Sequence, residues 1–274
     1  MMRIKEILIL LFVVSIAFSC KEAKKSETDT NSSTEKEESI SVTTLKSDSK
    51  AYEIEITPIE HATAVLEWND VIMYIDPTGG AAAFEGQKNP TLILITDIHG
   101  DHLSIETLNE LETSNATFVV PQAVADELPE NYAEQLVIMN NGTSKELSGI
   151  TIEALPMYNL RNEALKFHEK GRGNGYVLNI DDERIYFSGD TEDIPEMRSL
   201  QHIDKAFVTM NLPYTMTVES AASAVLDFKP KQVYPYHYRG KPDVSDVSKF
   251  KQLVDAGNQD IEVVQLDWYP NDEY

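Results

Sequence analysis

The sequence predicts an α/β fold in which two β-sheets lie face to face and helices cover both outer faces, a four-layer αββα sandwich. Two observations predict this fold. Short runs rich in Val, Ile, Leu, Tyr and Thr recur after residue 51, at the length typical of strands. Hairpins come first and strand–helix pairs follow, twice over, which is the order that two sheets with helices on their outer faces require.

The expected strands occupy residues 52–59, 62–68, 71–76, 91–96, 117–121, 136–139, 150–155, 176–180, 184–188, 205–210, 232–237 and 261–266. Hairpin turns are expected at Trp68-Asn69-Asp70 and at Asp181-Asp182-Glu183, because short polar runs join β-type segments there. Helical patterns lie between the strands at 104–111, 122–128, 218–228 and 244–256. Ser104 and Thr217 are expected to cap two of these helices.

The N-terminal part of the chain is expected to be an export signal and a tether. Residues 1–19 have a positively charged start, an apolar core and small residues before Cys20, as secretory signal peptides do. The pattern resembles the lipobox of bacterial lipoproteins, which implies that Cys20 carries the lipid; ordinary signal cleavage and a transmembrane anchor are the alternatives. Residues 20–50 lack glycine, proline and aromatic residues and are expected to form a disordered tether.

Residues 51–274 then have the length of one domain. The expected location is the bacterial cell envelope, facing the periplasm or on the outer membrane, with the membrane as a partner through the lipid anchor. The chain holds 46 Asp and Glu against 23 Lys and Arg. Nucleic acid is therefore not an expected partner, because phosphate contacts need a basic face. Cys20 is the only cysteine, so no intramolecular disulfide can form.

A cluster of ligand-type residues follows the apolar strand 91–96: Asp97, His99, Asp101 and His102. Side chains at the carboxyl end of a strand open into the cleft where ligand sites lie. Two carboxylates crowded there would lose hydration, at a cost of several kcal/mol per buried ion. Cations bound among them would offset this cost. Aspartate oxygen and histidine nitrogen suit zinc, iron or manganese. Gly100 is expected to permit a tight turn between the two pairs.

The motif Asp97-x-His99-x-Asp101-His102 resembles the His-x-His-x-Asp-His motif of the metallo-β-lactamase-fold hydrolases, with Asp in place of the first His. The resemblance extends through most of residues 52–268, and the predicted sandwich is the fold of that family. It implies a metal-dependent hydrolase with two divalent ions, Asp97 and His99 on metal 1 and Asp101 and His102 on metal 2. Zinc is expected, while the extra carboxylate of Asp97 would favour manganese or iron.

The resemblance implies further ligands from separated segments. Asp190 matches the bridging aspartate of the family, and His237 matches its last metal 2 ligand. At the usual position of the third metal 1 histidine this chain has Asn159. The loop 159–173 is expected to fold back so that His168 takes that role; in the alternative, His168 contacts the substrate and metal 1 is held more loosely.

Other polar residues are expected around the ligands. His61 resembles a histidine that lines the cleft, and Asp76 resembles an aspartate that supports the metal loops by hydrogen bonds. Tyr214 follows the strand 205–210 and could donate a hydrogen bond to a developing oxyanion, or only pack on its neighbours. His202 lies outside every motif and is expected at the surface.

The expected function is metal-assisted hydrolysis of a small-molecule or lipid ester, phosphodiester or lactone. The attacking group would be a hydroxide that bridges the two cations, oriented by Asp101 and assisted by Tyr214 or His61. One alternative is a lipid-anchored metal-binding protein without turnover, but a purely structural site is closed by four ligands and needs no second metal. Redox chemistry at a di-iron centre is a third class, whose family members carry Glu where this chain has His99.

Overall fold

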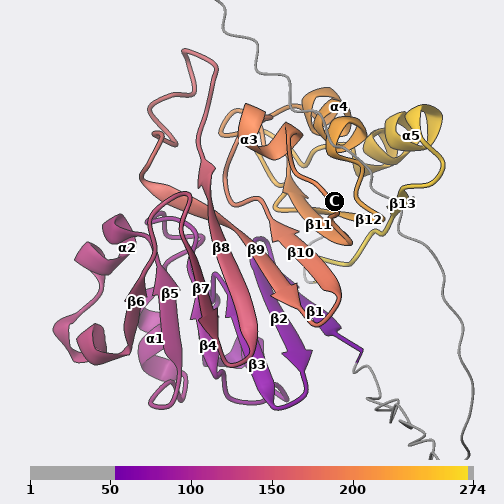
Figure 1. Cartoon of the computed structure of the whole chain (residues 1–274). Helices are drawn as coiled ribbons and strands as arrows, with labels where there is room; N and C mark the ends of the chain where they lie inside the picture. Colours follow the sequence, from indigo (N-terminus) through magenta and orange to yellow (C-terminus); the bar gives the residue numbers. More distant parts are fainter. Residues whose placement is uncertain (1–52, 271–274) are drawn as a thin grey trace, which may run out of the picture. The chain divides into compact units, whose positions relative to one another are not determined.

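Two β-sheets form the inner layers of the domain, and helices cover their outer faces (Figure 1). The computed structural model describes residues 53–270. The predicted signal peptide, the lipidated Cys20 and the tether therefore lie outside the described residues. Within residues 53–270, no helix combines the length and the apolar composition that crossing a membrane requires.

The first sheet has six strands in the order β1-β2-β3-β4-β5-β6. Its first three strands pair antiparallel, and β3 to β6 run parallel. The strands are β1 (Glu55–Glu60), β2 (Thr63–Trp68), β3 (Val71–Ile75), β4 (Leu92–Leu94), β5 (Thr117–Val120) and β6 (Leu136–Ile138). The helices of this half are η1 (Ala81–Phe84), α1 (Ile105–Glu110), α2 (Gln122–Glu127) and η2 (Glu130–Gln135).

The second sheet has seven strands in the order β13-β12-β11-β10-β9-β8-β7. Strands β7 to β10 pair antiparallel, and β10 to β13 run parallel. The strands are β7 (Ser144–Leu147), β8 (Ile150–Met157), β9 (Gly173–Ile180), β10 (Glu183–Phe187), β11 (Lys205–Thr209), β12 (Gln232–Tyr236) and β13 (Glu262–Val263). The helices are α3 (Pro195–Arg198), α4 (Val218–Phe228) and α5 (Val247–Gly257).

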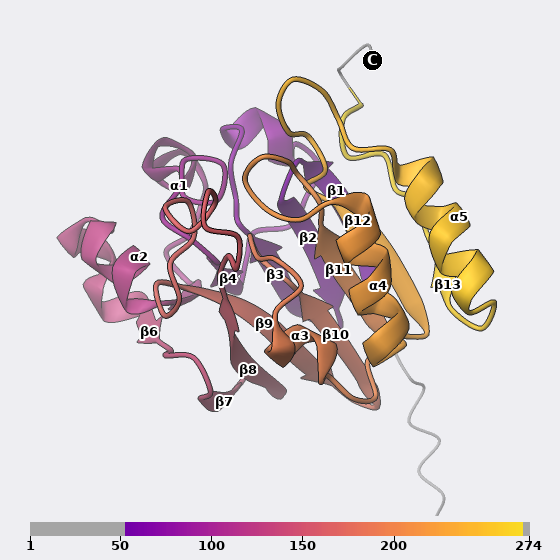
Figure 2. The ribbon, with the colours of Figure 1, turned by 90° about the horizontal axis from the view of Figure 1, so that it is seen from above.

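Three apolar cores hold the four layers together. Val65 and Leu66 are neighbours on β2 but belong to different cores, because successive side chains of a strand point to opposite faces. Leu66 packs between the two sheets with Phe207, whereas Val65 packs under α1 and α2. Phe250 of α5 belongs to the third core, on the outer face of the second sheet, where α4 and α5 lie (Figure 2). The predicted αββα sandwich is confirmed.

The helix caps follow the sequence prediction. The Ser104 hydroxyl accepts a hydrogen bond from the Thr107 N–H (3.2 Å), and α1 begins at the next residue. The Thr217 hydroxyl accepts one from the Ser220 N–H (3.1 Å) and starts α4 in the same way. Both predicted N-caps are confirmed.

Some elements escape the sequence prediction. β7 is an exposed edge strand without apolar alternation, so periodicity does not reveal it. β9 begins three residues before the predicted 176–180, with Gly173 and Gly175, residues that are depleted in strands. Glycine is needed at position 175, because a Cβ there would lie 2.9 Å from the Ser188 carbonyl oxygen.

Candidate metal centre

The segment after β4 brings both halves of the motif into one space. The His102 N–H donates to the His99 carbonyl (2.9 Å), which closes a turn before α1. Asp97 and His102 are fully buried, while His99 and Asp101 are partly exposed and line a cavity. The turn expected around Gly100 is present. Gly100 has no positive φ, and a Cβ there would meet no atom within 4 Å, so the backbone here does not require glycine.

Asp76 holds the ring of His102 from behind. Its carboxylate accepts hydrogen bonds from the Thr96 N–H (2.7 Å), the Thr96 hydroxyl (2.6 Å) and His102 Nδ1 (2.8 Å). Because the Nδ1–H of His102 donates to Asp76, Nε2 is the nitrogen left for the cluster. Burial would lower the pKa of His102, but Asp76 and Asp190 raise that pKa well above its usual value. A cation at Nε2 would replace a proton there. Asp76 thus has the supporting position that the sequence predicts.

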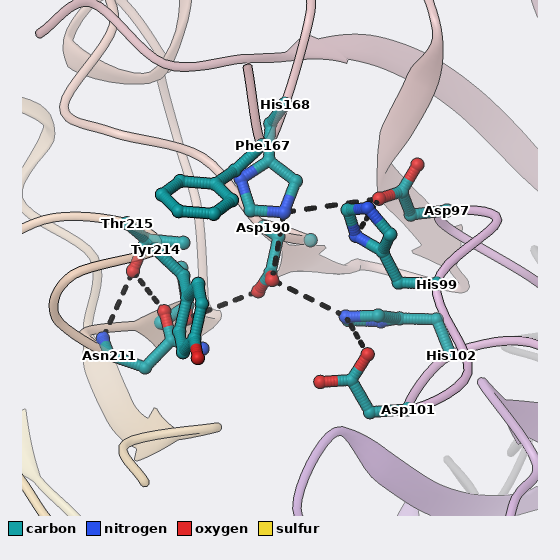
Figure 3. Close-up of polar contacts among 12 residues, drawn as sticks. Asp97, His99, Asp101, His102, Phe167, His168, Asp190, Asn211, Tyr214 and Thr215 are labelled. Carbon is teal, nitrogen blue, oxygen red and sulfur yellow. Dashed lines mark hydrogen bonds and ion pairs between the residues drawn. The ribbon is translucent and has the colours of Figure 1, made fainter. Parts of the chain in front are cut away.

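Asp190 lies at the centre of the cluster (Figure 3). It follows β10, and its Oδ2 is 3.1 Å from His168 Nε2 and 3.5 Å from His102 Nε2. Its Oδ1 is 3.1 Å from His237 Nε2. Burial would raise the pKa of Asp190, but the three histidines hold that pKa well below its usual range. One carboxylate therefore contacts imidazoles that come from three separate segments of the chain.

His237 and His61 pack together beside this carboxylate, with ring centroids 3.9 Å apart. His61 Nδ1 is hydrogen-bonded to the Tyr269 hydroxyl (2.8 Å), and His61 Nε2 lies 3.4 Å from Asp101 Oδ2. His237 Nε2 is 3.2 Å from His102 Nε2. Burial lowers the pKa of His237 to about 4, so this ring is neutral at pH 7 and can offer a nitrogen lone pair.

Asp97, His99 and His168 form a second group. Asp97 Oδ2 is 2.8 Å from His99 Nδ1 and 3.9 Å from His168 Nε2. The rings of His99 and His168 are 5.2 Å apart, so the loop after β8 folds back in the way that the sequence predicts. Asn159 instead is buried beside His168, and its amide nitrogen donates to the Tyr214 carbonyl (2.7 Å).

Arg172 pairs with Asp97, a contact that the sequence analysis does not anticipate. Its Nε and Nη2 donate to the two carboxylate oxygens (2.9 and 2.7 Å), and Nη2 also donates to the Phe167 carbonyl (2.6 Å). Burial would raise the pKa of Asp97, but His99 and Arg172 lower it. The chain itself thus neutralises part of this charge. The sequence contains a signal for this pair. A buried extra carboxylate such as Asp97 needs a cation, and Arg172 lies in the loop that is expected to fold onto the metal site.

The donor atoms fit divalent cations. Among residues 53–270, ligand atoms lie within 4.8 Å of one another in three groups: His61, Asp101 and His237; Asp97, His99 and His168; His102, Asp190 and His237. Imidazole nitrogen and carboxylate oxygen are the ligands that zinc, manganese and iron share. The last group is buried in all its members. Two imidazole nitrogens facing one carboxylate away from water form a set that a cation completes.

A cavity of about 340 Å³ opens onto the cluster. Its lining combines ligand-type residues with aromatic, amide and basic ones: His61, His99, Asp101, Phe167, His168, Asp190, Asn211, Tyr214, Arg239, Gly240 and Lys241. The rings of Phe167 and Tyr214 meet edge to face, 5.1 Å apart. Tyr214 therefore stands in the wall of the cavity, where the oxyanion role would need it.

A family model described as the beta-lactamase superfamily domain matches residues 75–238, the stretch that holds Asp76, the 97–102 motif, Asp190 and His237. The chain belongs to this superfamily. A UPF0173 metal-dependent hydrolase from Pyrococcus horikoshii is 32% identical over 211 residues, which cover 73% of this chain and 92% of that protein. The fold and the expectation of a metal-dependent hydrolase are thereby confirmed.

Two solved structures resemble this chain in fold. The crystal structure of a candidate metal-dependent hydrolase from Parabacteroides distasonis is 34% identical, with a TM-score of 0.70, and covers 78% of this chain and 93% of that one. A metallo hydrolase from Ignicoccus hospitalis, 22% identical, has a TM-score of 0.66 and covers 78% of this chain and 95% of that one, which shows the same fold.

The structure brings together every residue that the sequence singled out for this superfamily site: His61, Asp97, His99, Asp101, His102, His168, Asp190, Tyr214 and His237. Their roles as ligands or catalytic groups, and the number and identity of the ions, stay predictions. His202 is exposed, as predicted. Arg172 and the basic residues of the cavity wall are the parts of the site that the sequence analysis missed.

Proposed function

We propose that this superfamily protein hydrolyses an ester, phosphodiester or lactone of a small-molecule or lipid substrate at a dinuclear metal centre. The observation that carries the proposal is the position of Asp190. Its two oxygens lie 3.1 Å from His168 Nε2 and 3.1 Å from His237 Nε2, and these histidines belong to different ligand groups. A two-ion site needs a carboxylate that contacts ligands of both groups. A closed structural site, which holds one ion, needs no such carboxylate.

The ligands divide between two ions. Asp97, His99 and His168 would hold one ion, and His102, Asp101 and His237 the other, with Asp190 shared between them. Zinc suits this set, and the carboxylate of Asp97 also admits manganese or iron. When bound, such ions supply a water molecule that ionises near neutral pH and an electrophile for the scissile oxygen.

The chain's own groups would orient the reactants. Asp101 faces the cavity, with Oδ2 3.4 Å from His61 Nε2 and 3.6 Å from His237 Nε2. Burial would raise the pKa of Asp101, but His61, His102 and His237 lower it. The carboxylate is therefore ionised at pH 7 and can accept a hydrogen bond from the attacking water. His61, held by Tyr269, keeps Asp101 in place, and the Tyr214 hydroxyl donates to the oxyanion as it forms.

The test uses metal-reconstituted protein and a panel of phosphodiester, carboxylic ester, lactone and β-lactam substrates. We expect turnover of at least one of the first three classes and two equivalents of metal per chain. Asp190→Asn should lower kcat/KM by about 100-fold or more, since the shared carboxylate is lost. Asp260→Asn, at an exposed position outside the cluster, is the matched control.

Two results would contradict the proposal. Full activity of Asp190→Asn would remove the shared carboxylate from the reaction. Bound metal without turnover on any of the three substrate classes would favour the alternative, a metal-binding protein that catalyses no reaction.

The cellular address is a separate proposal, which rests on the sequence around Cys20. We propose that the domain is displayed in the cell envelope by a lipid on this cysteine. Metabolic labelling with a palmitate analogue should mark the wild-type protein and not Cys20→Ser. Equal labelling of the two proteins would contradict the anchor.

A further inference from the structure

Two lysines without a carboxylate partner lie beside aromatic rings of the cavity wall. Lys166 Nζ lies 4.9 Å from the ring centroid of Phe167, and Lys241 Nζ lies 5.9 Å from that of Tyr214. Both rings line the cavity, and Lys241 lines it as well. Both lysines are exposed, and neither forms an ion pair within residues 53–270. In a chain with 46 acidic and 23 basic residues, unpaired cations beside a cavity call for an explanation.

Most other lysines of the described part are paired with carboxylates. These pairs are Lys88–Glu67, Lys170–Glu196, Lys205–Glu183, Lys231–Asp204, Lys249–Glu219 and Lys251–Asp255. Besides Lys166 and Lys241, only Lys145 and Lys229 lack such a partner in residues 53–270. Of these four lysines, Lys241 lines the cavity and Lys166 lies beside Phe167, a residue of its wall.

The backbone that carries Lys241 is fixed against the loop that carries Tyr214. The Lys241 N–H donates to the Leu212 carbonyl (2.8 Å). A Cβ on Gly240 would lie 1.9 Å from the same oxygen, so only glycine allows this approach. Lys241 is thus placed at the cavity by its neighbours, although its ammonium group is exposed.

Lys166 is placed by a comparable anchor. It precedes Phe167, whose carbonyl accepts a hydrogen bond from Arg172 Nη2 (2.6 Å), and Arg172 in turn is held by Asp97. The edge-to-face contact between Phe167 and Tyr214 then joins the two lysine-bearing regions across the cavity wall.

We propose that the substrate is a small anion, with its negative group held by Lys166 and Lys241 and an apolar part resting on Phe167 and Tyr214. This inference rests on the proposed function and names its substrate class. The acidic surface elsewhere repels anions, so a local pair of cations focuses them on the cavity. The aromatic rings offer an apolar surface to the uncharged part of the same molecule.

The test measures binding and does not depend on turnover. Phenylphosphonate, an aromatic anion, and benzyl alcohol, a neutral aromatic, are titrated into the metal-reconstituted protein by calorimetry. We expect Lys166→Gln and Lys241→Gln each to raise the Kd of phenylphosphonate about fivefold, as the loss of one exposed charge contact does. Lys145→Gln, an exposed and unpaired lysine on β7, should leave this Kd unchanged.

Added salt separates the lysines from the metal ions. Raising NaCl should weaken phenylphosphonate binding to the wild-type protein more than to the double variant Lys166→Gln/Lys241→Gln, because exposed charges are screened. A second arm adds phosphatidylglycerol vesicles. Displacement of phenylphosphonate by vesicles would assign the anion to a lipid headgroup, and no displacement would assign it to a soluble molecule.

Equal phenylphosphonate affinities in the wild-type protein and both single variants would overturn the inference, as would tighter binding of benzyl alcohol than of phenylphosphonate. Neither result would touch the proposed hydrolase, which the substrate panel and Asp190→Asn test separately. Conversely, lysine-dependent anion binding in a protein that turns over no substrate would keep the anion site and reject the hydrolase.

Discussion

The Arg172 guanidinium donates two hydrogen bonds to the Asp97 carboxylate, at 2.9 and 2.7 Å. This pair distinguishes the two ligand groups. Asp97 already has a cation from the chain, whereas Asp190 contacts three imidazoles and, at 3.5 Å, the Thr209 hydroxyl, but no lysine or arginine among residues 53–270. We therefore expect the two metal sites to differ in affinity, with the weaker one at Asp97.

Replacing Arg172 by Met should reduce this difference in affinity between the two sites. Without its partner, the buried Asp97 charge would destabilise the metal-free protein by about 3 kcal/mol, and the free carboxylate would bind the second metal equivalent about tenfold more tightly. Chemical denaturation measures the first effect and a competitive chelator titration the second. Arg184→Met, which breaks a partly exposed pair with Glu153, is the control. Unchanged affinity for the second equivalent would show that Arg172 does not compete with the metal.

Asp76 tests whether the supporting hydrogen bonds matter. Asp76→Asn keeps the size of the side chain but removes the charge that accepts bonds from Thr96 and His102. Metal affinity should fall about 10- to 100-fold, because the His102 ring is no longer oriented. Chelator competition measures it, with Asp70→Asn in the exposed β2–β3 turn as control. The same affinity in wild-type and Asp76→Asn proteins would refute this role.

Two glycines beside the ligands should respond differently to substitution. Gly189, just before Asp190, has φ +59°, and a Cβ there would lie 2.6 Å from Met157 Sδ. Gly189→Ala should therefore cost about 2 kcal/mol of stability and reduce metal binding. Gly100 lies in open space, so Gly100→Ala should stay within about 0.5 kcal/mol of the wild type. Denaturant unfolding of both variants measures the two losses of stability. An equal loss in Gly100→Ala and Gly189→Ala would contradict the difference in backbone conformation between these positions.

The sequence leaves two interpretations of Tyr214 open: a hydrogen-bond donor to the oxyanion, or a residue that only packs on its neighbours. If its hydroxyl donates to the oxyanion, Tyr214→Phe should lower kcat by about 100-fold and leave KM nearly unchanged. If the ring only packs on Phe167, Tyr214→Phe should be silent, whereas Phe167→Leu should raise KM. Steady-state kinetics on the best substrate of the panel separate the two interpretations.

Much of this architecture is predictable because its causes are local. Strand alternation, the caps Ser104 and Thr217, and the hairpin turns follow from neighbouring residues, and the 97–102 motif crowds charges that need a cation. These local features predict the fold and the first ligand motif. The roles expected for His168, Asp190 and His237 follow from the resemblance to the metallo-β-lactamase-fold hydrolases.

Other features depend on contacts that no local pattern encodes. β7 pairs with β8 through its backbone and has an exposed face, so its sequence carries no apolar signal. The Arg172–Asp97 pair joins residues 75 positions apart. Lys241 reaches the cavity only because Gly240 lets the backbone approach Leu212. Such relations arise from the assembled fold.

The most direct measurement is an anomalous-difference map from crystals of the metal-loaded protein. We predict two peaks about 3.5–4 Å apart, one beside His99 and His168 and one beside His102 and His237, with Asp190 between them. A single peak that Asp190 does not contact, or peaks only at the surface, would contradict a shared two-ion centre.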